Sequence, residues 1–474
     1  MLFRTRPMLF IGTLTLLGAT SCGGRPGEAD LVCDFPDPQC PDGLVCSIMV
    51  EGDPFCVAPL TIRGTVLDAT TDEPIPGALV QAVDVNGAAV GTSAETDDNG
   101  TYTLIVPAVR DIDGMPVEGT YTLRAQAAGY QGFPSAIRPA LPLDATTADL
   151  DEGTWIIEDT LTVVKLLPLL IDTTNLGSIS GTVDAESRAG ILVIADGDSG
   201  AFTGFTNADG AYTIFNVPLG IYSVRGYAGG VQLTPATATL NTDDDLVDID
   251  LLESSDPLGT VSGSVQIVDP SGASATSVVL AVESTFVENA ARGEVPPGLR
   301  VGEITSGFTI NGVPNGRYVV LAAFENDGLV RDPDQTIGGT SIVRITVPDP
   351  DTGNIVNLAE GFKVTGALAV VMPGSDGPEE LPNPTPVFTW EDDSSEDGYE
   401  IRVFDAFGTE IWSKLDIASV SGSETVSHTY AGPGLIPGMF YQFRVTSFRD
   451  KNGVRTAIST TEDLKGVFQL SLMP

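Results

Sequence analysis

The chain of 474 residues contains one histidine, His428, and only three tryptophans. It has 23 lysines and arginines against 64 aspartates and glutamates, which gives a net charge of −41. Binding to DNA, RNA or anionic lipid needs clustered basic side chains, so this charge argues against those partners. A single histidine also excludes the catalytic zinc sites that are built from two histidines and a glutamate. We therefore expect no metal and no other cofactor.

Long stretches with apolar residues at helical spacing are also absent. Strand-length runs of Val, Ile, Thr and Tyr lie instead between turn residues, and the chain contains 53 glycines and 33 prolines. This pattern predicts an all-β protein. At about 100–150 residues per domain, the length predicts roughly three to five domains.

The N-terminus has the pattern of an export signal. Arg4 and Arg6 precede a largely apolar run over residues 8–18, which is too short to cross a bilayer as a helix. The sequence Ala-Thr-Ser-Cys that ends at Cys22 resembles the lipobox of bacterial lipoproteins. The resemblance implies a signal peptide over residues 1–21, lipidation of Cys22, and membrane attachment through that lipid. Gly23, in place of an aspartate, implies the outer membrane.

The other four cysteines lie close together in a segment rich in Pro, Gly and Asp, which we assign with the anchor to residues 22–59: Cys33, Cys40, Cys46 and Cys56. An even number of cysteines in an exported chain predicts two disulfides, and the spacing leaves three pairings open. A metal site is the alternative, but no CxxC pair and no nearby histidine supports it. We expect a small disulfide-rich segment.

A pattern of glycine, aromatic residue and proline occurs three times downstream. Each copy follows a matched strand, at residues 61–68, 178–185 and 260–267. Glycine and an aromatic residue open both later strands of each copy: Gly100 and Tyr102, Gly119 and Tyr121, Gly210 and Tyr212, Gly220 and Tyr222, Gly307 and Phe308, Gly316 and Tyr318. Alternating apolar residues and Asp/Asn-Gly turns predict antiparallel two-sheet sandwiches.

The run from "GTVLDATTDEPIPGALVQAVD" to "YTLRAQAAGY" resembles a carboxypeptidase regulatory-like domain, a small transthyretin-like or CnaB-like sandwich. The resemblance covers residues 60–171, 178–253 and, more weakly, 260–362. It implies three such domains that serve as spacers, adhesion modules or carbohydrate binders and carry no catalytic residues of their own. Some CnaB-like relatives form Lys–Asn isopeptide bonds, but residues 178–253 contain no lysine.

The last part of the chain, residues 364–474, resembles a fibronectin type III domain. The spacing Leu435-x-Pro437-Gly438-x-x-Tyr441 matches the tyrosine-corner strand of that family, and Trp390 stands where the family has a core tryptophan. The expected fold is thus all-β, with three carboxypeptidase regulatory-like sandwiches and one fibronectin-like sandwich after the disulfide-rich segment. We expect Trp390, Tyr399, Tyr441 and Phe443 to be core residues.

Several motifs suggest chemistry, but a structural interpretation is favoured for each. Gly197-Asp198-Ser199-Gly200 resembles the nucleophile turn of trypsin-like proteases, yet the one histidine follows this serine and lies in another sandwich. Acidic runs at 241–250, 348–354 and 391–398 suit Ca²⁺, but none has the spacing of an EF-hand, and solvated acidic turns are the favoured interpretation. The rings of Trp155, Trp412 or Tyr130 could form a surface on which a sugar stacks, but ordinary packing inside a sandwich is the favoured interpretation. A facing carboxylate pair for glycoside hydrolysis stays open.

These observations predict a non-enzymatic lipoprotein of the outer membrane that faces the cell surface or the periplasm. It would act as a scaffold, an adhesion protein or a recognition stalk, and the alternative is a carbohydrate-binding protein. The expected partners are the membrane, through the N-terminal lipid, and envelope proteins or polysaccharide, with no nucleic acid. We expect a monomer whose short acidic linkers hold the domains in a semi-extended string.

Overall fold

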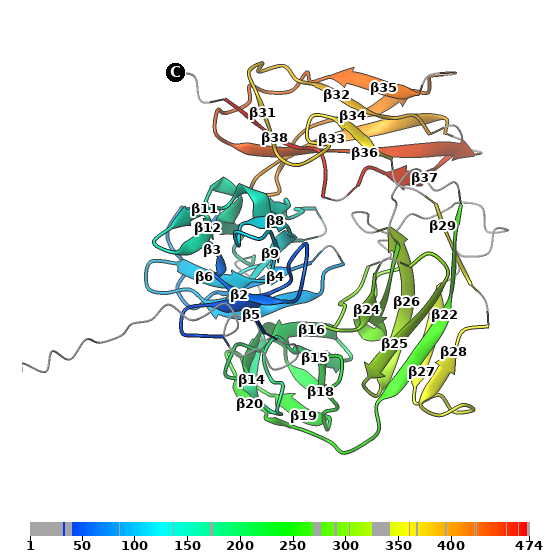
Figure 1. Cartoon of the computed structure of the whole chain (residues 1–474). Coiled ribbons are helices and arrows are strands. Elements are labelled where there is room, and N and C mark those ends of the chain that lie inside the picture. The colour runs from blue at the N-terminus through cyan, green and yellow to red at the C-terminus, as the bar shows by residue number, and fades with distance from the viewer. Residues whose placement is uncertain are drawn as a thin grey trace, which may run out of the picture.

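The computed structural model describes residues 32–33, 40–84, 86–135, 137–170, 174–268, 276–288, 292–302, 304–324, 342–359, 361–365, 368–393, 396–420, 422, 424–451, 453–462 and 464–471. Strands dominate these residues (Figure 1), and the helices among them are three 3-10 turns: η2 (Ala145–Thr147), η3 (Thr160–Thr162) and η4 (Glu283–Thr285). Within this part of the chain, no helix has the length and apolar character needed to span a bilayer. The predicted signal peptide and Cys22 lie outside the described residues. The all-β prediction is confirmed.

The Cys-rich segment forms a two-stranded sheet of β1 (Val45–Ser47) and β2 (Phe55–Val57). Two disulfides link this sheet to the preceding residues: Cys33 is bonded to Cys46 of β1, and Cys40 to Cys56 of β2. Three of these sulfur atoms lie within 4.8 Å of one another, but the disulfides already occupy them. The structure thus selects one of the three pairings that the sequence left open.

Three modules with the same strand order follow, each made of two packed sheets. In every module a four-stranded sheet lies against a sheet whose first strand pairs antiparallel with one strand and parallel with two short ones. We call the modules 1 to 3.

The bounds of the module strands are as follows. Module 1 has sheets of β10 (Leu143–Asp144), β9 (Thr120–Gln126), β4 (Leu79–Val83) and β5 (Ala89–Glu95), and of β11 (Asp149–Asp151), β12 (Thr154–Ile157), β3 (Leu60–Asp68), β13 (Val163–Leu166) and β6 (Thr101–Val106). Module 2 has β16 (Gly200–Phe205), β15 (Leu192–Gly197), β18 (Gly220–Tyr227) and β19 (Ala236–Leu240), and β17 (Ala211–Pro218), β14 (Leu176–Asp184), β20 (Leu246–Asp248) and β21 (Leu251–Leu252). Module 3 has β24 (Arg300–Val301), β23 (Thr276–Val282), β26 (Gly316–Phe324) and β27 (Val343–Val347), and β25 (Gly307–Val313), β22 (Gly259–Val268), β28 (Ile355–Asn357) and β29 (Phe362–Thr365).

The recurring glycine and tyrosine residues have specific structural roles. In the sheets that contain β3, β14 and β22, a glycine of that strand lies opposite the aromatic residue of the antiparallel neighbour: Gly64 and Tyr102, Gly181 and Tyr212, Gly263 and Phe308. The later tyrosine of each module donates its hydroxyl hydrogen bond to the carbonyl of the strand-ending proline: Tyr121 to Pro107, Tyr222 to Pro218, and Tyr318 to Pro314. The repeat therefore encodes one strand-to-strand corner, built three times.

Module 4 is a sandwich of a three-stranded and a six-stranded sheet. The first contains β30 (Val370–Met372), β32 (Val387–Glu391) and β35 (Thr425–Thr429); the second contains β31 (Glu379–Leu381), β38 (Val467–Leu470), β36 (Phe440–Lys451), β33 (Gly398–Asp405), β34 (Glu410–Ala418) and β37 (Val454–Thr460). Trp390, Tyr399 and Phe443 are fully buried in its core, and Tyr441 is nearly so. All four residues are core residues, as predicted.

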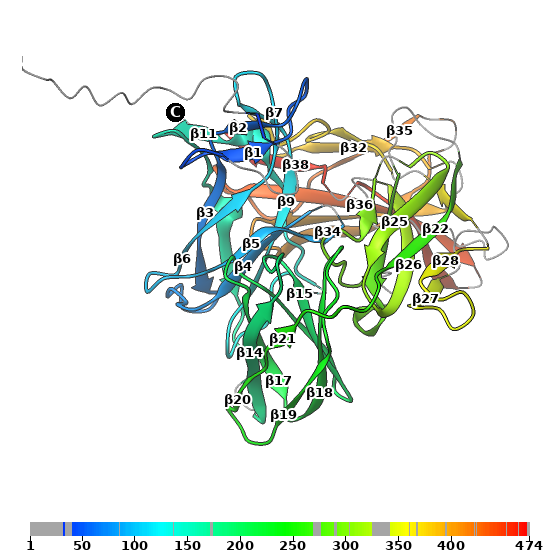
Figure 2. The ribbon, with the colours of Figure 1, turned by 60° about the horizontal axis from the view of Figure 1, so that its bottom comes forward.

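The modules pack against one another and do not form the semi-extended string that we expected. Modules 2 and 4 lie on opposite sides of module 1, and module 3 lies beside them (Figures 1 and 2). Strand β15 shows one cause of this packing. In β15, Val193 faces the core of module 2, whereas Leu192 and Ile194 belong to a cluster shared with module 3. Runs that are apolar on both strand faces need cover on both faces.

Candidate functional site

The candidate site is a cleft of about 350 Å³ to which modules 1, 3 and 4 all contribute. Its walls are mainly polar and come from five chain segments: Val117, Glu118, Gly119, Thr120, Pro142, Asp144, Thr146, Arg300, Asp376, Gly377, Pro378, Leu464, Lys465 and Val467. A cleft of this size between domains is a usual place for a small ligand or a short peptide segment.

Module 1 forms one wall through the end of β8 (Pro116–Glu118), the start of β9, and β10 with the following turn. Asp144 is the N-cap of η2, and its Oδ1 accepts hydrogen bonds from the backbone N and the Oγ1 of Thr146 at 2.8 and 2.7 Å. These bonds hold the turn in place. The Asp144 carboxylate therefore has a defined position at the cleft.

Module 4 forms the opposite wall through two loops that are bonded to each other. The Gly466 N donates to the Gly374 carbonyl at 2.9 Å, and the Gly374 N donates to the Glu379 carboxylate at 3.0 Å. The carbonyl of Lys465 accepts a hydrogen bond from the Gln442 side chain at 2.8 Å. This wall too is held by its own hydrogen bonds.

Charges of both signs line the cleft. Glu118, Asp144 and Asp376 are acidic, and Arg300 and Lys465 are basic. Module 3 supplies Arg300, whose Nη1 lies 3.2 Å from the Asp84 carboxylate of module 1. Burial raises the pKa of Asp84 and Arg300 opposes that shift. The site thus presents separate anionic and cationic groups to whatever enters.

The lining offers carboxylates, two basic groups and two threonine hydroxyls that can bind a polar ligand. Among the described residues that line the cleft there is no serine, cysteine or histidine. There is also no aromatic ring on which a sugar could stack. Its chemistry fits a polar ligand that carries both an amino and a carboxyl group, because both signs of charge would then be paired.

The residues singled out by their sequence motifs do not converge on the cleft. Gly197 and Gly200 are paired in the β15–β16 hairpin, so the protease-like motif is a turn, as predicted. Trp155 packs against the core of module 1, and Trp412 stacks on His428 with ring centroids 5.9 Å apart. Tyr130 donates its hydroxyl hydrogen bond to Asp68 at 3.1 Å.

The acidic runs contain carboxylates that bind the protein itself. Asp245 accepts from the Asn241 N at 2.9 Å, Asp250 from Thr182, and Asp349 from the N of Asp351 at 2.9 Å. Hydrogen bonding lowers the pKa of Asp250 and of Asp349. Within the described residues, the cysteines of the disulfides are the one group of three or more ligands close enough to share an ion.

The sequence did not reveal the cleft, since its residues run from 117 to 467 and no local spacing connects them. The packing of the modules against one another, in contrast, could have been predicted from the sequence. The runs Leu-Val-Ile-Ala at 192–195 and Val-Val-Leu-Ala at 278–281 are continuously apolar, which is typical of strands covered on both faces.

Comparison with known proteins identifies one part of the chain. The model of the carboxypeptidase regulatory-like domain matches residues 61–149, which lie in module 1, and no curated protein matches the sequence. Among solved structures, the chain is similar to the Bacillus anthracis TIE protein at 12% identity, with 65% of this chain and 50% of that chain covered and a TM-score of 0.15. The match therefore spans half the length of that protein.

The chain is also similar to two pilins, again with low sequence identity and a low TM-score. The streptococcal ancillary pilin has 14% identity, 64% and 99% coverage of the two chains and a TM-score of 0.17. BcpA, the major pilin subunit of Bacillus cereus, has 10% identity, 64% and 99% coverage and a TM-score of 0.18. Scores this low support no conclusion about arrangement or function.

Proposed function

We propose that the protein is a non-enzymatic recognition scaffold of the bacterial envelope, attached to the outer membrane through a lipid on Cys22. The observations that carry the scaffold are the packing of the four sandwiches against one another and the mixed-charge cleft that modules 1, 3 and 4 form. We propose the cleft as the recognition site, with an envelope protein or polysaccharide carrying amino and carboxyl groups as ligand.

The module assignments belong to the same proposal. Modules 2 and 3 repeat the strand order of module 1, which supports reading residues 178–253 and 260–362 as further domains of its family. Module 4 has the sheet β30–β32–β35, and its Tyr441 hydroxyl accepts a hydrogen bond from the Ile436 N at 2.8 Å. This tyrosine corner supports a fibronectin type III assignment for residues 364–474.

The carbohydrate-binding alternative is supported by no specific observation. A stacking surface needs exposed rings, and the strongly exposed large apolar residues of the described chain are all aliphatic or methionine. A glycan would have to bind through hydrogen bonds and charge alone. We therefore keep polysaccharide as a ligand class for the cleft and propose no separate aromatic site.

The test measures binding of the chain to isolated envelope components: outer-membrane vesicles freed of the protein, and purified peptidoglycan. We expect saturable binding that falls at least tenfold with Lys465→Ala and with Asp376→Ala. Lys414→Ala, on β34 and outside the cleft, is the matched control and should bind normally. No saturable binding, or equal binding by all variants, would contradict the proposal. Acyl-chain mass on Cys22 tests the anchor separately.

A further inference from the structure

The Cys-rich segment is bound to module 1 through an insertion that the other modules lack. Residues 108–118 separate Pro107 from Gly119, whereas one residue separates Pro218 from Gly220 in module 2. The insertion forms the hairpin β7 (Val109–Arg110) with β8. The Arg110 N donates to the Ile48 carbonyl at 2.9 Å, and the Val50 N donates to the Arg110 carbonyl at 2.8 Å. The segment and hairpin thus form one continuous edge.

One face of this edge is buried and the other is apolar and exposed. The side chain of Arg110 is fully buried, and the backbone of Met49 forms a parallel β-bridge with Arg110. Because successive side chains of a strand point to opposite faces, Ile48 and Val50 point outward. Ile48 is 57% exposed and Val50 62% exposed.

The hairpin turn that follows Arg110 contains two more exposed apolar side chains. Ile112 is 95% exposed, and Met115 is 44% exposed. The Asp111 carboxylate accepts hydrogen bonds from the backbone N of Asp113 at 3.0 Å and of Met115 at 2.8 Å, which preforms the turn around Ile112. We call Ile48, Val50, Ile112 and Met115 the apolar patch.

We propose that the apolar patch docks onto the surface of the phospholipid bilayer that holds the protein's lipid. The inference rests on the proposed lipid anchor. Ten residues beyond Cys22 bring the chain to Val32, and at full extension they span about 35 Å. A patch tethered so closely has an effective concentration near millimolar at the bilayer, so a weak apolar contact is enough to hold it there.

The charges beside the patch specify the kind of lipid. Asp111 and Asp113 flank Ile112, and Glu51 and Asp53 follow Val50. These carboxylates would be repelled by anionic headgroups, so the patch fits a zwitterionic surface. Figure 2 shows β1, β2 and β7 together at one end of the molecule, with β19 and β20 at the other. Docking at this end would direct module 2 away from the membrane.

The test places one indole in the patch and asks whether lipid reaches it. The full chain is bound to vesicles of zwitterionic phospholipid with brominated acyl chains, which quench nearby tryptophan. With Ile112→Trp, we expect the added emission to fall at least twofold. Ile221→Trp, at a site that is 68% exposed on β18 of module 2, is the matched control and should lose none. Adding Ile48→Ser and Val50→Ser should restore the emission of the Ile112→Trp chain.

Each outcome separates the patch from the anchor. Acylated chain that floats with vesicles but shows no quenching with Ile112→Trp overturns the patch and leaves the anchor intact. If Cys22 carries no acyl chain, the anchor fails, and vesicles added to the same chain then read the patch directly: quenching supports it and no quenching overturns it. An emission change that depends on protein concentration without vesicles would identify a second copy as the occupant and overturn the membrane proposal.

Discussion

Modules 1 and 2 have the same strand order but differ in what surrounds them. Module 2 has an apolar outer face at Leu192 and Ile194, and its Pro218–Gly220 corner is short. Module 1 has buried Gln81 in the equivalent central strand, and its corner is expanded into the hairpin that binds the Cys-rich segment. The shared sandwich therefore sets the topology, and insertions and outer-face residues decide what each copy contacts.

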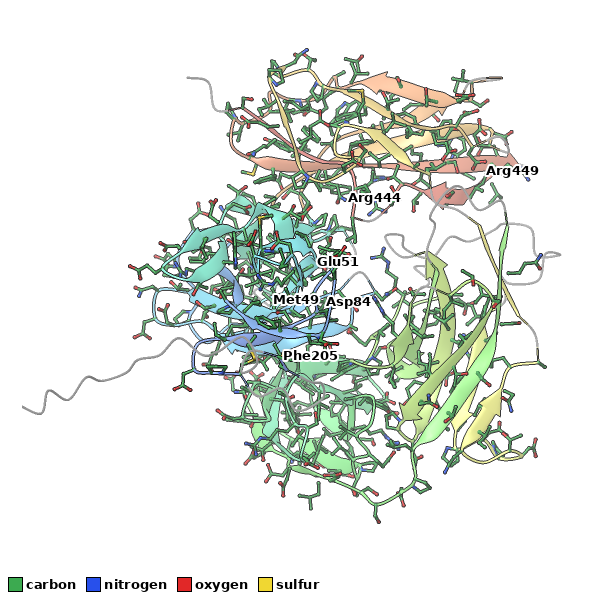
Figure 3. All side chains as sticks on the ribbon, viewed as in Figure 1. Met49, Glu51, Asp84, Phe205, Arg444 and Arg449 are labelled. Atoms are coloured by element: carbon green, nitrogen blue, oxygen red, sulfur yellow. A yellow bond between two sulfur atoms is a disulfide. The ribbon has the colours of Figure 1, made fainter. Side chains whose placement is uncertain are left out.

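Module 1 contacts every other part of the protein. Its core cluster includes Ala406, Phe440 and Val467 of module 4. Its Arg124 forms a two-pronged ion pair with Glu294 of module 3, in which Nη2 lies 2.8 Å from Oε1. The same guanidinium lies 5.4 Å from the ring centroid of Phe205, where module 2 meets module 1 (Figure 3).

The largest effect should come from breaking this three-module contact. Glu294→Ala leaves Arg124 largely buried without its partner, which should cost about 4 kcal/mol in the free energy of unfolding. The measurement is urea unfolding followed by signals from more than one module. Glu158→Ala removes an exposed partner of Arg63 and should cost less than about 1 kcal/mol. Equal stability of the two variants would contradict the role of the buried pair.

The outer face of module 2 comes next. Ile194→Ala removes a side chain that is 1% exposed and lies in the cluster shared with module 3, at a cost of about 3 kcal/mol. Ile221→Ala, on the same module but 68% exposed, should change stability by less than about 0.5 kcal/mol. Equal free energies of unfolding for the two variants would contradict this difference between the modules, because the stability of module 2 would then not depend on its contact with module 3.

A smaller effect should follow from Asn216→Gly, at the contact between modules 1 and 2. The Asn216 side chain donates to the carbonyls of Ala127 and Tyr130 and accepts from the Gly129 N, each at 2.9 Å. Its φ of 56° suits glycine, so only the amide bonds are lost. We expect a loss of about 1.5 kcal/mol by urea unfolding. Unchanged stability would show that these bonds do not join the modules.

The smallest effect should be a pH dependence within module 4. Burial, with a contribution from Lys414, lowers the pKa of His428 below the ordinary histidine value of about 6.5. The unfolded chain therefore binds this proton more readily, and stability should fall as the pH drops below about 6.5. His428→Gln should remove that part of the slope. Because the chain has one histidine, its NMR titration reads the pKa directly; a midpoint above 6.5 would reverse the sign.

Much of the fold could be predicted because its signals are local. The proline, glycine and tyrosine spacing of each corner, such as Pro218, Gly220 and Tyr222, predicts a strand pair from adjacent residues. The contacts between modules have weaker signals. Arg124 and Glu294 lie 170 positions apart, and no local sequence pattern around either residue indicates that the two form an ion pair. The cleft was missed for the same reason.

Small-angle X-ray scattering of the chain in solution tests most directly whether the modules form one body. About 440 residues packed as one compact unit should have a radius of gyration of about 22 Å. Four modules of about 13 Å each, joined as a semi-extended string, should give roughly 40 Å. The packed arrangement predicts the smaller value. A value near the larger one would contradict it and remove the cleft that modules 1, 3 and 4 share.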